Sequence, residues 1–63
     1  MPHILKQLRK QNGLTQAQLA YALRVHQTAV SQWECGRTAP DRETIVKLAI
    51  FYRVSADLIL GIQ

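Results

Sequence analysis

Apolar residues recur at helical spacing along almost the whole chain. The first group consists of Ile4, Leu5 and Leu8, which stand among lysine, arginine and glutamine residues. This spacing predicts an amphipathic helix near the start of the chain. Asn12 and Gly13 follow, and a glycine in the left-handed conformation commonly ends a helix. We therefore expect the first helix to end before residue 12.

The second helix has the most complete start signal in the sequence. Thr15 is a preferred N-cap residue, and Gln18 stands three positions later, where it completes a capping box. Leu14 and Leu19 flank this box at the spacing of a hydrophobic staple. The helix is therefore predicted to begin after Thr15 and to continue to Leu23.

Three more helices are predicted in the second half of the chain. Residues 27–35 have helical spacing and are followed by Gly36, which ends the run. Asp41 is expected to cap a fourth helix, and Ser55 is expected to cap a short fifth helix that runs through Leu60. No segment has the alternating pattern of a strand. The predicted fold is therefore all-α, a compact bundle of five helices.

Length and charge narrow the possible functions. A chain of 63 residues has room for one core, so we expect a single domain over residues 1–63 and no enzymatic activity. Lys and Arg number eight against four Asp and Glu, and the formal charge of +4 is typical of a protein that binds a polyanion. An ordinary soluble domain with excess lysine has the same balance of charges, so charge alone does not establish that the chain binds a polyanion.

Cysteine content and hydropathy exclude several other classes. The single cysteine, Cys35, cannot form an internal disulfide or a multi-thiolate metal site, so no metal or cofactor is expected. Cys35 also stands at the C-terminal end of a predicted helix, where the helix dipole disfavours a thiolate nucleophile. No signal peptide or membrane-spanning run is visible. We expect a cytoplasmic protein that binds neither membranes nor a small-molecule ligand.

The outer face of the third predicted helix carries the candidate chemistry. Two short helices joined by about three residues have helix-turn-helix geometry, in which the second helix can enter the major groove of DNA. The arc opposite the buried side of this helix is uncharged and carries Gln27, Thr28, Ser31 and Gln32. Amides and hydroxyls both donate and accept hydrogen bonds, as base edges require. A plain polar surface is the alternative, but Gln16 and Arg37 flank the arc where phosphates would lie.

Three short motifs together resemble those of one family. Residues 14–20 are Leu-Thr-Gln-Ala-Gln-Leu-Ala, residues 30–34 are Val-Ser-Gln-Trp-Glu, and Gly-Arg follows at 36–37. The chain resembles the Cro/C1-type helix-turn-helix family of lambdoid phage repressors and bacterial regulators over nearly its whole length. This resemblance implies a lambda-repressor-like bundle that binds a double-stranded DNA operator as a transcriptional regulator, with repression as the expected effect.

The resemblance also implies roles for single residues. The residues that match base-reading positions are Gln27, Thr28, Ser31 and Gln32. Gln16 and Arg37 match positions that touch the phosphate backbone. Trp33 matches a core position, and Glu34 is expected to brace the region of Arg37.

Two residues depart from the pattern of this family. Arg24 stands in the interhelix turn where the family has glycine at positive φ, and arginine there should cost about 1 kcal/mol. Arg24 either adds a phosphate contact or is a tolerated surface residue. His26 stands at the N-cap of the reading helix, where Ser or Thr is usual, so this cap should be weak. His26 is a further candidate for a phosphate contact in its protonated form.

The C-terminal third holds more apolar residues than so small a core must bury. They are Val46, Ile50, Phe51, Leu58, Ile59 and Ile62. These residues either complete the core or face a partner. The family resemblance points to a homodimer through the fifth helix, with Leu58, Ile59 and Ile62 at the interface. The alternative function is a protein-interaction module, or an antitoxin-type partner protein, that keeps this fold.

Overall fold

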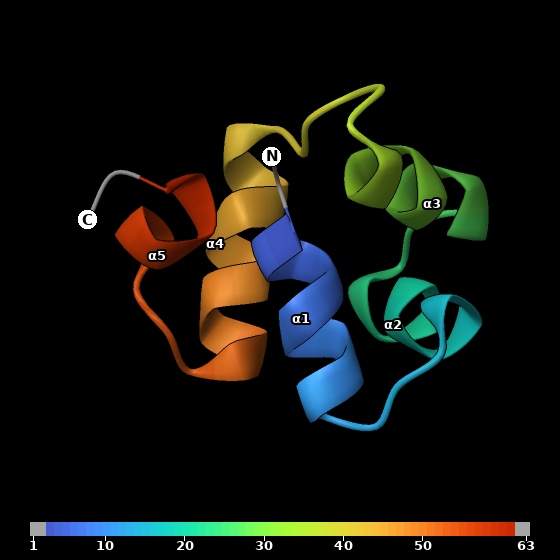
Figure 1. Ribbon diagram of the computed structural model, residues 1–63, viewed down its shortest axis with the longest axis horizontal. Helices are drawn as coiled ribbons and strands as arrows, with labels where there is room; N and C mark the ends of the chain where they lie inside the picture. Colours follow the sequence, from blue (N-terminus) through green and yellow to red (C-terminus); the bar gives the residue numbers. More distant parts are fainter. Residues whose placement is uncertain (1–2, 62–63) are drawn as a thin grey trace.

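Five helices follow one another in the part of the chain that the computed structural model describes, residues 3–61 (Figure 1). They are α1 (His3–Gln11), α2 (Gln16–Leu23), α3 (Gln27–Cys35), α4 (Arg42–Tyr52) and α5 (Ala56–Leu60). No strand occurs within these described residues. The expected all-α fold of five helices is therefore confirmed.

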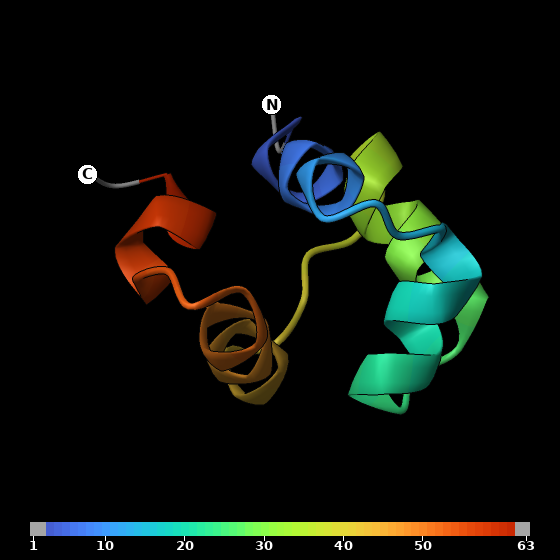
Figure 2. The same ribbon diagram turned by 90° about the horizontal axis from the view of Figure 1, so that it is seen from below.

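The helices form two groups on either side of α1 (Figure 1). On one side α2 packs against α3, and on the other side α4 packs against α5. Seen from below, α1 lies between α5 and α3, and it contacts both of them (Figure 2). Contacts of α3 with α1 and of α2 with α4 therefore join the α2–α3 pair to the rest of the bundle.

One hydrophobic cluster receives side chains from all five helices. Val30 of α3 and Leu48 of α4 lie at its centre and are 0% exposed. The other buried apolar members are Leu5, Leu8, Leu19, Ala20, Leu23, Trp33 and Ile59. Trp33 is 7% exposed, which confirms the core position expected for this residue. A single core thus holds the two groups of helices together.

Local hydrogen bonds fix where the helices begin. Thr15 Oγ1 accepts from the Gln18 N–H at 3.0 Å, and Gln18 Oε1 accepts from the Thr15 N–H at 2.9 Å, which is the predicted capping box. Asp41 and Ser55 each accept a hydrogen bond from the third backbone N–H of the helix that follows. His26 forms no side-chain cap bond, so the weak cap expected for α3 is confirmed.

Two arginines end helices in the left-handed backbone conformation. Arg24 follows α2 at φ 60°, and Arg53 follows α4 at φ 58°. In this conformation the Cβ atom approaches the following carbonyl oxygen, which costs about 1 kcal/mol or more for any residue except glycine. The structure confirms the positive φ expected at Arg24 and adds a second case at Arg53.

Glycine at either position should relieve this strain. We expect Arg24→Gly and Arg53→Gly each to raise the free energy of unfolding by about 1 kcal/mol. For a domain of this size, that gain raises the melting temperature by about 4–8 °C. Thermal unfolding followed by circular dichroism measures the change.

Lys10→Gly is the control for these two variants. Lys10 is exposed and lies in the last turn of α1 without a left-handed backbone, so glycine there should bring no gain in stability. If both arginine variants melt at or below the temperature of the unsubstituted chain, the strain assigned to the two arginines is absent.

Candidate nucleic-acid interface

A shallow depression on the surface of α3 collects most of the residues predicted to contact DNA. Its volume is about 530 Å³. The start of α2, the outer face of α3 and the segment after α3 line it with Gln16, Gln27, Thr28, Ser31, Gln32, Cys35 and Arg37. The structure thus brings the four candidate base-reading residues and two candidate phosphate contacts onto one surface, and it adds Cys35.

This depression offers hydrogen-bonding groups and no carboxylate. Gln27, Thr28 and Ser31 are exposed and Gln32 is half-buried, because α3 packs on the core through its opposite side. Amides and hydroxyls donate and accept hydrogen bonds, and the guanidinium of Arg37 adds a permanent positive charge. Such a surface suits a ligand that combines polar edges with negative charge.

The other two candidate phosphate contacts lie outside this depression. Arg24 lines a separate depression between α2 and α4. His26 is exposed at the N-terminal end of α3, next to Gln27. The structure therefore leaves His26 beside the polar arc and places Arg24 on a different part of the surface.

The two predicted dimer residues that the structure describes, Leu58 and Ile59, differ in exposure. Ile59 is 8% exposed and belongs to the core, so the expectation that it faces a partner is corrected. Leu58 is half-buried, and Ile62 lies outside the described residues. Leu60, which the sequence pattern did not single out, is 50% exposed. The apolar surface that α5 offers is therefore centred on Leu60.

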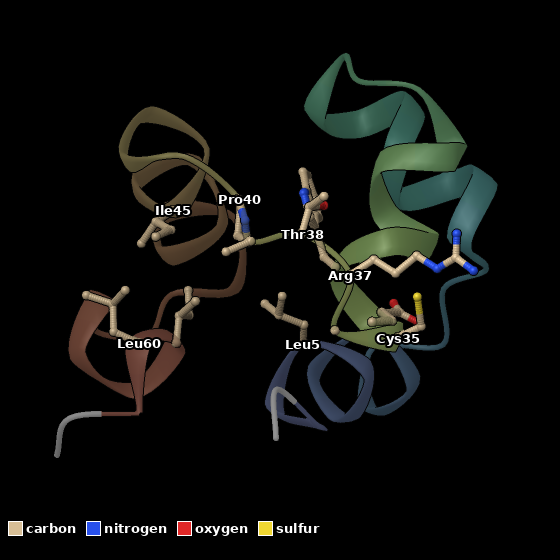
Figure 3. Close-up of a pocket in the computed structure, with 12 residues that line it drawn as sticks. Leu5, Cys35, Arg37, Thr38, Pro40, Ile45 and Leu60 are labelled. Atoms are coloured by element: carbon tan, nitrogen blue, oxygen red, sulfur yellow. The ribbon is translucent and has the colours of Figure 1, made fainter.

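Leu60 borders an apolar cleft of about 550 Å³ between α5, the start of α1 and the segment that joins α3 to α4 (Figure 3). Leu5, Pro40 and Ile45 line the same cleft. In Figure 3 the side chain of Arg37 points away from Ile45 and Leu60, so its charge lies outside the apolar part of the cleft. The cleft and the polar depression therefore meet at the end of α3.

A buried ion pair joins α1 to α3. Arg9 Nε donates to Glu34 Oε2 at 2.6 Å, and Arg9 Nη2 donates to Glu34 Oε1 at 3.0 Å. The two side chains are 10% and 5% exposed. Arg9 Nη1 also donates to the carbonyl oxygen of Leu14 at 2.8 Å, and Gln16 Nε2 donates to Glu34 Oε1 at 3.1 Å. One carboxylate thus connects α1, the start of α2 and the end of α3.

Glu34 faces this network rather than Arg37, so the bracing role expected for it at Arg37 was wrong. Its carboxylate turns inward because Arg9 supplies a bidentate partner there. The consequence for the polar depression is indirect. Gln16 uses one N–H of its amide on Glu34, and the second N–H stays available at the edge of the depression.

The sequence contains a signal for this pair. Arg9 stands four positions after Leu5, and Glu34 stands four positions after Val30. Residues four apart share one face of a helix, so both charged side chains lie on stripes that face the core. Opposite charges on two buried stripes are the pattern expected of a pair that meets inside the fold.

The ion pair shifts the pKa values of both partners. The hydrogen bond to Glu34 raises the pKa of Arg9 above its usual value, against the opposing effect of burial. Burial raises the pKa of Glu34, but the hydrogen bonds from Arg9 and Gln16 outweigh it and leave the pKa below its ordinary value of 4.5. Both side chains are therefore charged at neutral pH. Burial raises the pKa of Tyr52 to about 12, so its hydroxyl stays neutral.

The described part of the chain holds neither a membrane-spanning helix nor a cluster of metal-ligating side chains. None of its helices is both long enough and apolar enough to span a membrane. Among residues 3–61, no group of three or more His, Cys, Asp or Glu side chains is placed to hold a metal ion.

Comparison with known proteins gives one family and two relatives. Residues 5–59 match the sequence model of the helix-turn-helix family. The chain is 43% identical over 57 residues to the HTH-type transcriptional activator BcrR of Enterococcus faecalis. These 57 residues make up 90% of this chain and 28% of that relative. It is 37% identical over 57 residues to the HTH-type transcriptional regulator ImmR of Bacillus subtilis, and the matched stretch makes up 90% of this chain and 45% of that relative. The chain therefore spans less than half the length of either relative, and no solved structure matches it.

Removing one partner of the buried pair should be more harmful than removing both. Glu34→Gln leaves the Arg9 guanidinium buried beside a neutral amide, and we expect the free energy of unfolding to fall by about 3 kcal/mol. The double variant Arg9→Met/Glu34→Met replaces both charges with apolar side chains and should lose less. Urea unfolding at neutral pH compares them, and a double variant less stable than Glu34→Gln would contradict the prediction.

The ion pair should also make stability depend on acidity. Because the pKa of Glu34 is lower in the folded chain, its contribution is complete above the ordinary pKa of 4.5 and is lost as the pH falls toward the folded value. We expect Glu34→Gln to lose less stability than the unsubstituted chain between about pH 5 and about pH 3. Urea unfolding across this range measures the difference.

Asp41→Asn is the matched control for acid dependence. The hydrogen bonds from Thr44 lower the pKa of the exposed Asp41 carboxyl, so Asp41 adds a loss of the same sign. Asparagine keeps the N-cap, and the variant should retain the part of the acid dependence that belongs to Glu34. Parallel acid curves for Glu34→Gln and the unsubstituted chain would show that Glu34 does not carry the effect.

Proposed function

The chain belongs to the helix-turn-helix family, and from this premise we propose that it is a DNA-binding regulator of transcription that inserts α3 into the major groove of an operator. The observation that carries the proposal is the depression of about 530 Å³, which gathers the polar arc of α3 with Gln16 and Arg37. The formal charge of +4 favours a polyanionic ligand.

The proposed base-reading residues lie on the outer face of α3 and are Gln27, Thr28, Ser31 and Gln32. A glutamine amide can pair with the two hydrogen-bonding groups that adenine presents in the major groove, and a hydroxyl can pair with several bases. These are uncharged groups, so they distinguish bases by the match of donors and acceptors rather than by charge.

The proposed phosphate contacts surround this arc. Arg37 supplies a positive charge at one end of the depression, and Gln16 supplies the amide N–H that Glu34 leaves available. His26, exposed at the N-terminal end of α3, is a third proposed contact. Arg24 does not line the polar depression and lines a different one. Phosphate contacts of this kind set the register of the reading helix on the duplex.

We also propose that two copies bind the operator as a symmetric dimer. One copy offers a single reading helix, whereas two copies can place their helices about 34 Å apart on successive turns of the major groove. The proposed contact is α5, through its exposed Leu60 and the half-buried Leu58.

The direction of regulation is part of this proposal. The relative from Enterococcus faecalis is named an activator, and the relative from Bacillus subtilis is named a regulator. We propose repression for this chain, acting in the cytoplasm, because a small domain that covers an operator excludes other proteins from the same stretch of duplex.

Fluorescence anisotropy tests the reading helix. A duplex selected from a random pool by the chain itself is titrated at several salt concentrations. Gln27→Ala and Gln32→Ala should each weaken binding to this duplex by about tenfold or more and leave the affinity for unrelated duplex unchanged. Arg37→Ala should weaken binding to all duplexes alike and reduce the salt slope by about one.

Gln7→Ala is the control, because Gln7 is exposed on α1 and does not line the depression. A tenfold loss in this variant would place the interface elsewhere. If no duplex binds more tightly than about 10⁻⁴ M, the chain does not read DNA.

Sedimentation tests the proposed dimer. Leu60→Ser should shift the chain toward the monomer and weaken binding to the selected duplex, because it removes the central apolar contact. Tyr21→Ser is the control, since Tyr21 is 88% exposed on α2, away from α5. A monomeric unsubstituted chain that forms a one-to-one complex with the duplex would overturn the dimer.

A further inference from the structure

A third depression, of about 360 Å³, lies between the end of α2 and the last turns of α4. We call it the α2–α4 patch, and its residues are Ala22, Leu23, Arg24, Lys47, Ile50 and Phe51. It shares no residue with the polar depression of α3 or with the cleft beside Leu60. An occupant of the patch would therefore leave both of those surfaces free.

Two apolar side chains of this patch are exposed, although the inner side of α4 is buried in the core. Leu48 on the inner side of α4 is 0% exposed, whereas Ile50 is 71% exposed and Phe51 is 41% exposed. The Phe51 ring meets Tyr52 edge to face, with ring centroids 5.1 Å apart, so its orientation is supported by a partly buried neighbour. Two exposed apolar side chains that line one depression can receive apolar groups of a partner.

The charge at the patch is entirely positive. Arg24 and Lys47 line it, and no Asp or Glu does. Neither of these two side chains forms an ion pair within residues 3–61. Two unpaired cations beside an apolar floor are complementary to a segment that carries carboxylates next to apolar side chains.

The backbone at Arg24 offers a way to test the role of its charge. Arg24 keeps the left-handed conformation, which a glycine would adopt without strain. Arg53 has the same conformation but does not line the patch, and it therefore provides a matched comparison.

We propose that the α2–α4 patch binds an acidic, amphipathic segment of a partner protein. Ile50 and Phe51 receive its apolar side chains, and Arg24 and Lys47 pair with its carboxylates. A second copy of this chain is a poorer occupant, because a symmetric contact through the patch would bring Arg24 and Lys47 of both copies together. The patch would allow the chain to hold a partner while α3 contacts DNA.

The probe for this proposal is a synthetic peptide of about 15 residues with Leu and Phe at helical spacing and Glu at the other positions. It is titrated into the ¹⁵N-labelled chain while amide chemical shifts are recorded. The largest shifts should fall on the residues of the α2–α4 patch. A peptide with Lys in place of Glu should not bind, because it meets like charges.

Matched variants separate charge from apolar contact. Arg24→Gly should weaken peptide binding by about three- to fivefold, and Arg53→Gly, which makes the same backbone change, should leave it unaltered. Ile50→Ser should weaken binding by about tenfold or more, whereas Leu60→Ser should not change it. DNA binding of the same variants is measured in parallel.

Each other result overturns the proposal. Absence of shifts at the patch up to about millimolar peptide removes the site. The largest shifts on α3 would mean that the acidic peptide occupies the DNA-binding surface instead. Shifts at the patch that depend on protein concentration without peptide would assign the patch to a second copy. Equal effects of Arg24→Gly and Arg53→Gly would show that backbone conformation, and not the charge of Arg24, is responsible.

Discussion

The ion pair between Arg9 and Glu34 is the interaction on which the geometry of the molecule depends. Burying a single charge is costly, so the pair is favourable only in the arrangement that brings both side chains and their other hydrogen-bond partners together. That arrangement joins α1, the carbonyl of Leu14, the start of α2 and the end of α3. These hydrogen bonds link the orientation of the reading helix to the rest of the bundle. Apolar contacts alone specify that orientation less well, because they have little directionality.

The same network also shapes the proposed interface. Gln16 belongs both to the network and to the rim of the polar depression, so its amide is held in place before any ligand arrives. A contact group that is already ordered loses less conformational entropy on binding. The buried carboxylate of Glu34 therefore orients Gln16 at the rim of the polar depression, although Glu34 does not line the depression itself.

So small a chain has little interior, and its surface is divided among different chemistries. The depression on α3 is polar with one permanent charge, the cleft beside Leu60 is mainly apolar, and the α2–α4 patch is apolar with a basic rim. The first two meet at Cys35 and Arg37, which line both, and so the proposed DNA contact and the proposed dimer contact adjoin. The α2–α4 patch stands apart from them.

The sequence by itself determined the helices and the polar arc of α3. The capping box at Thr15 depends on residues only three positions apart, so the local pattern was sufficient to predict it, whereas the left-handed turn at Arg24 was expected from the family resemblance. Tertiary structure decided which side of the five-residue α5 is buried, because apolar residues occupy more than one of its faces and periodicity does not distinguish Ile59 from Leu60. It also decided that Arg9 meets Glu34, since the two are 25 positions apart and only the packing of α1 on α3 brings them together.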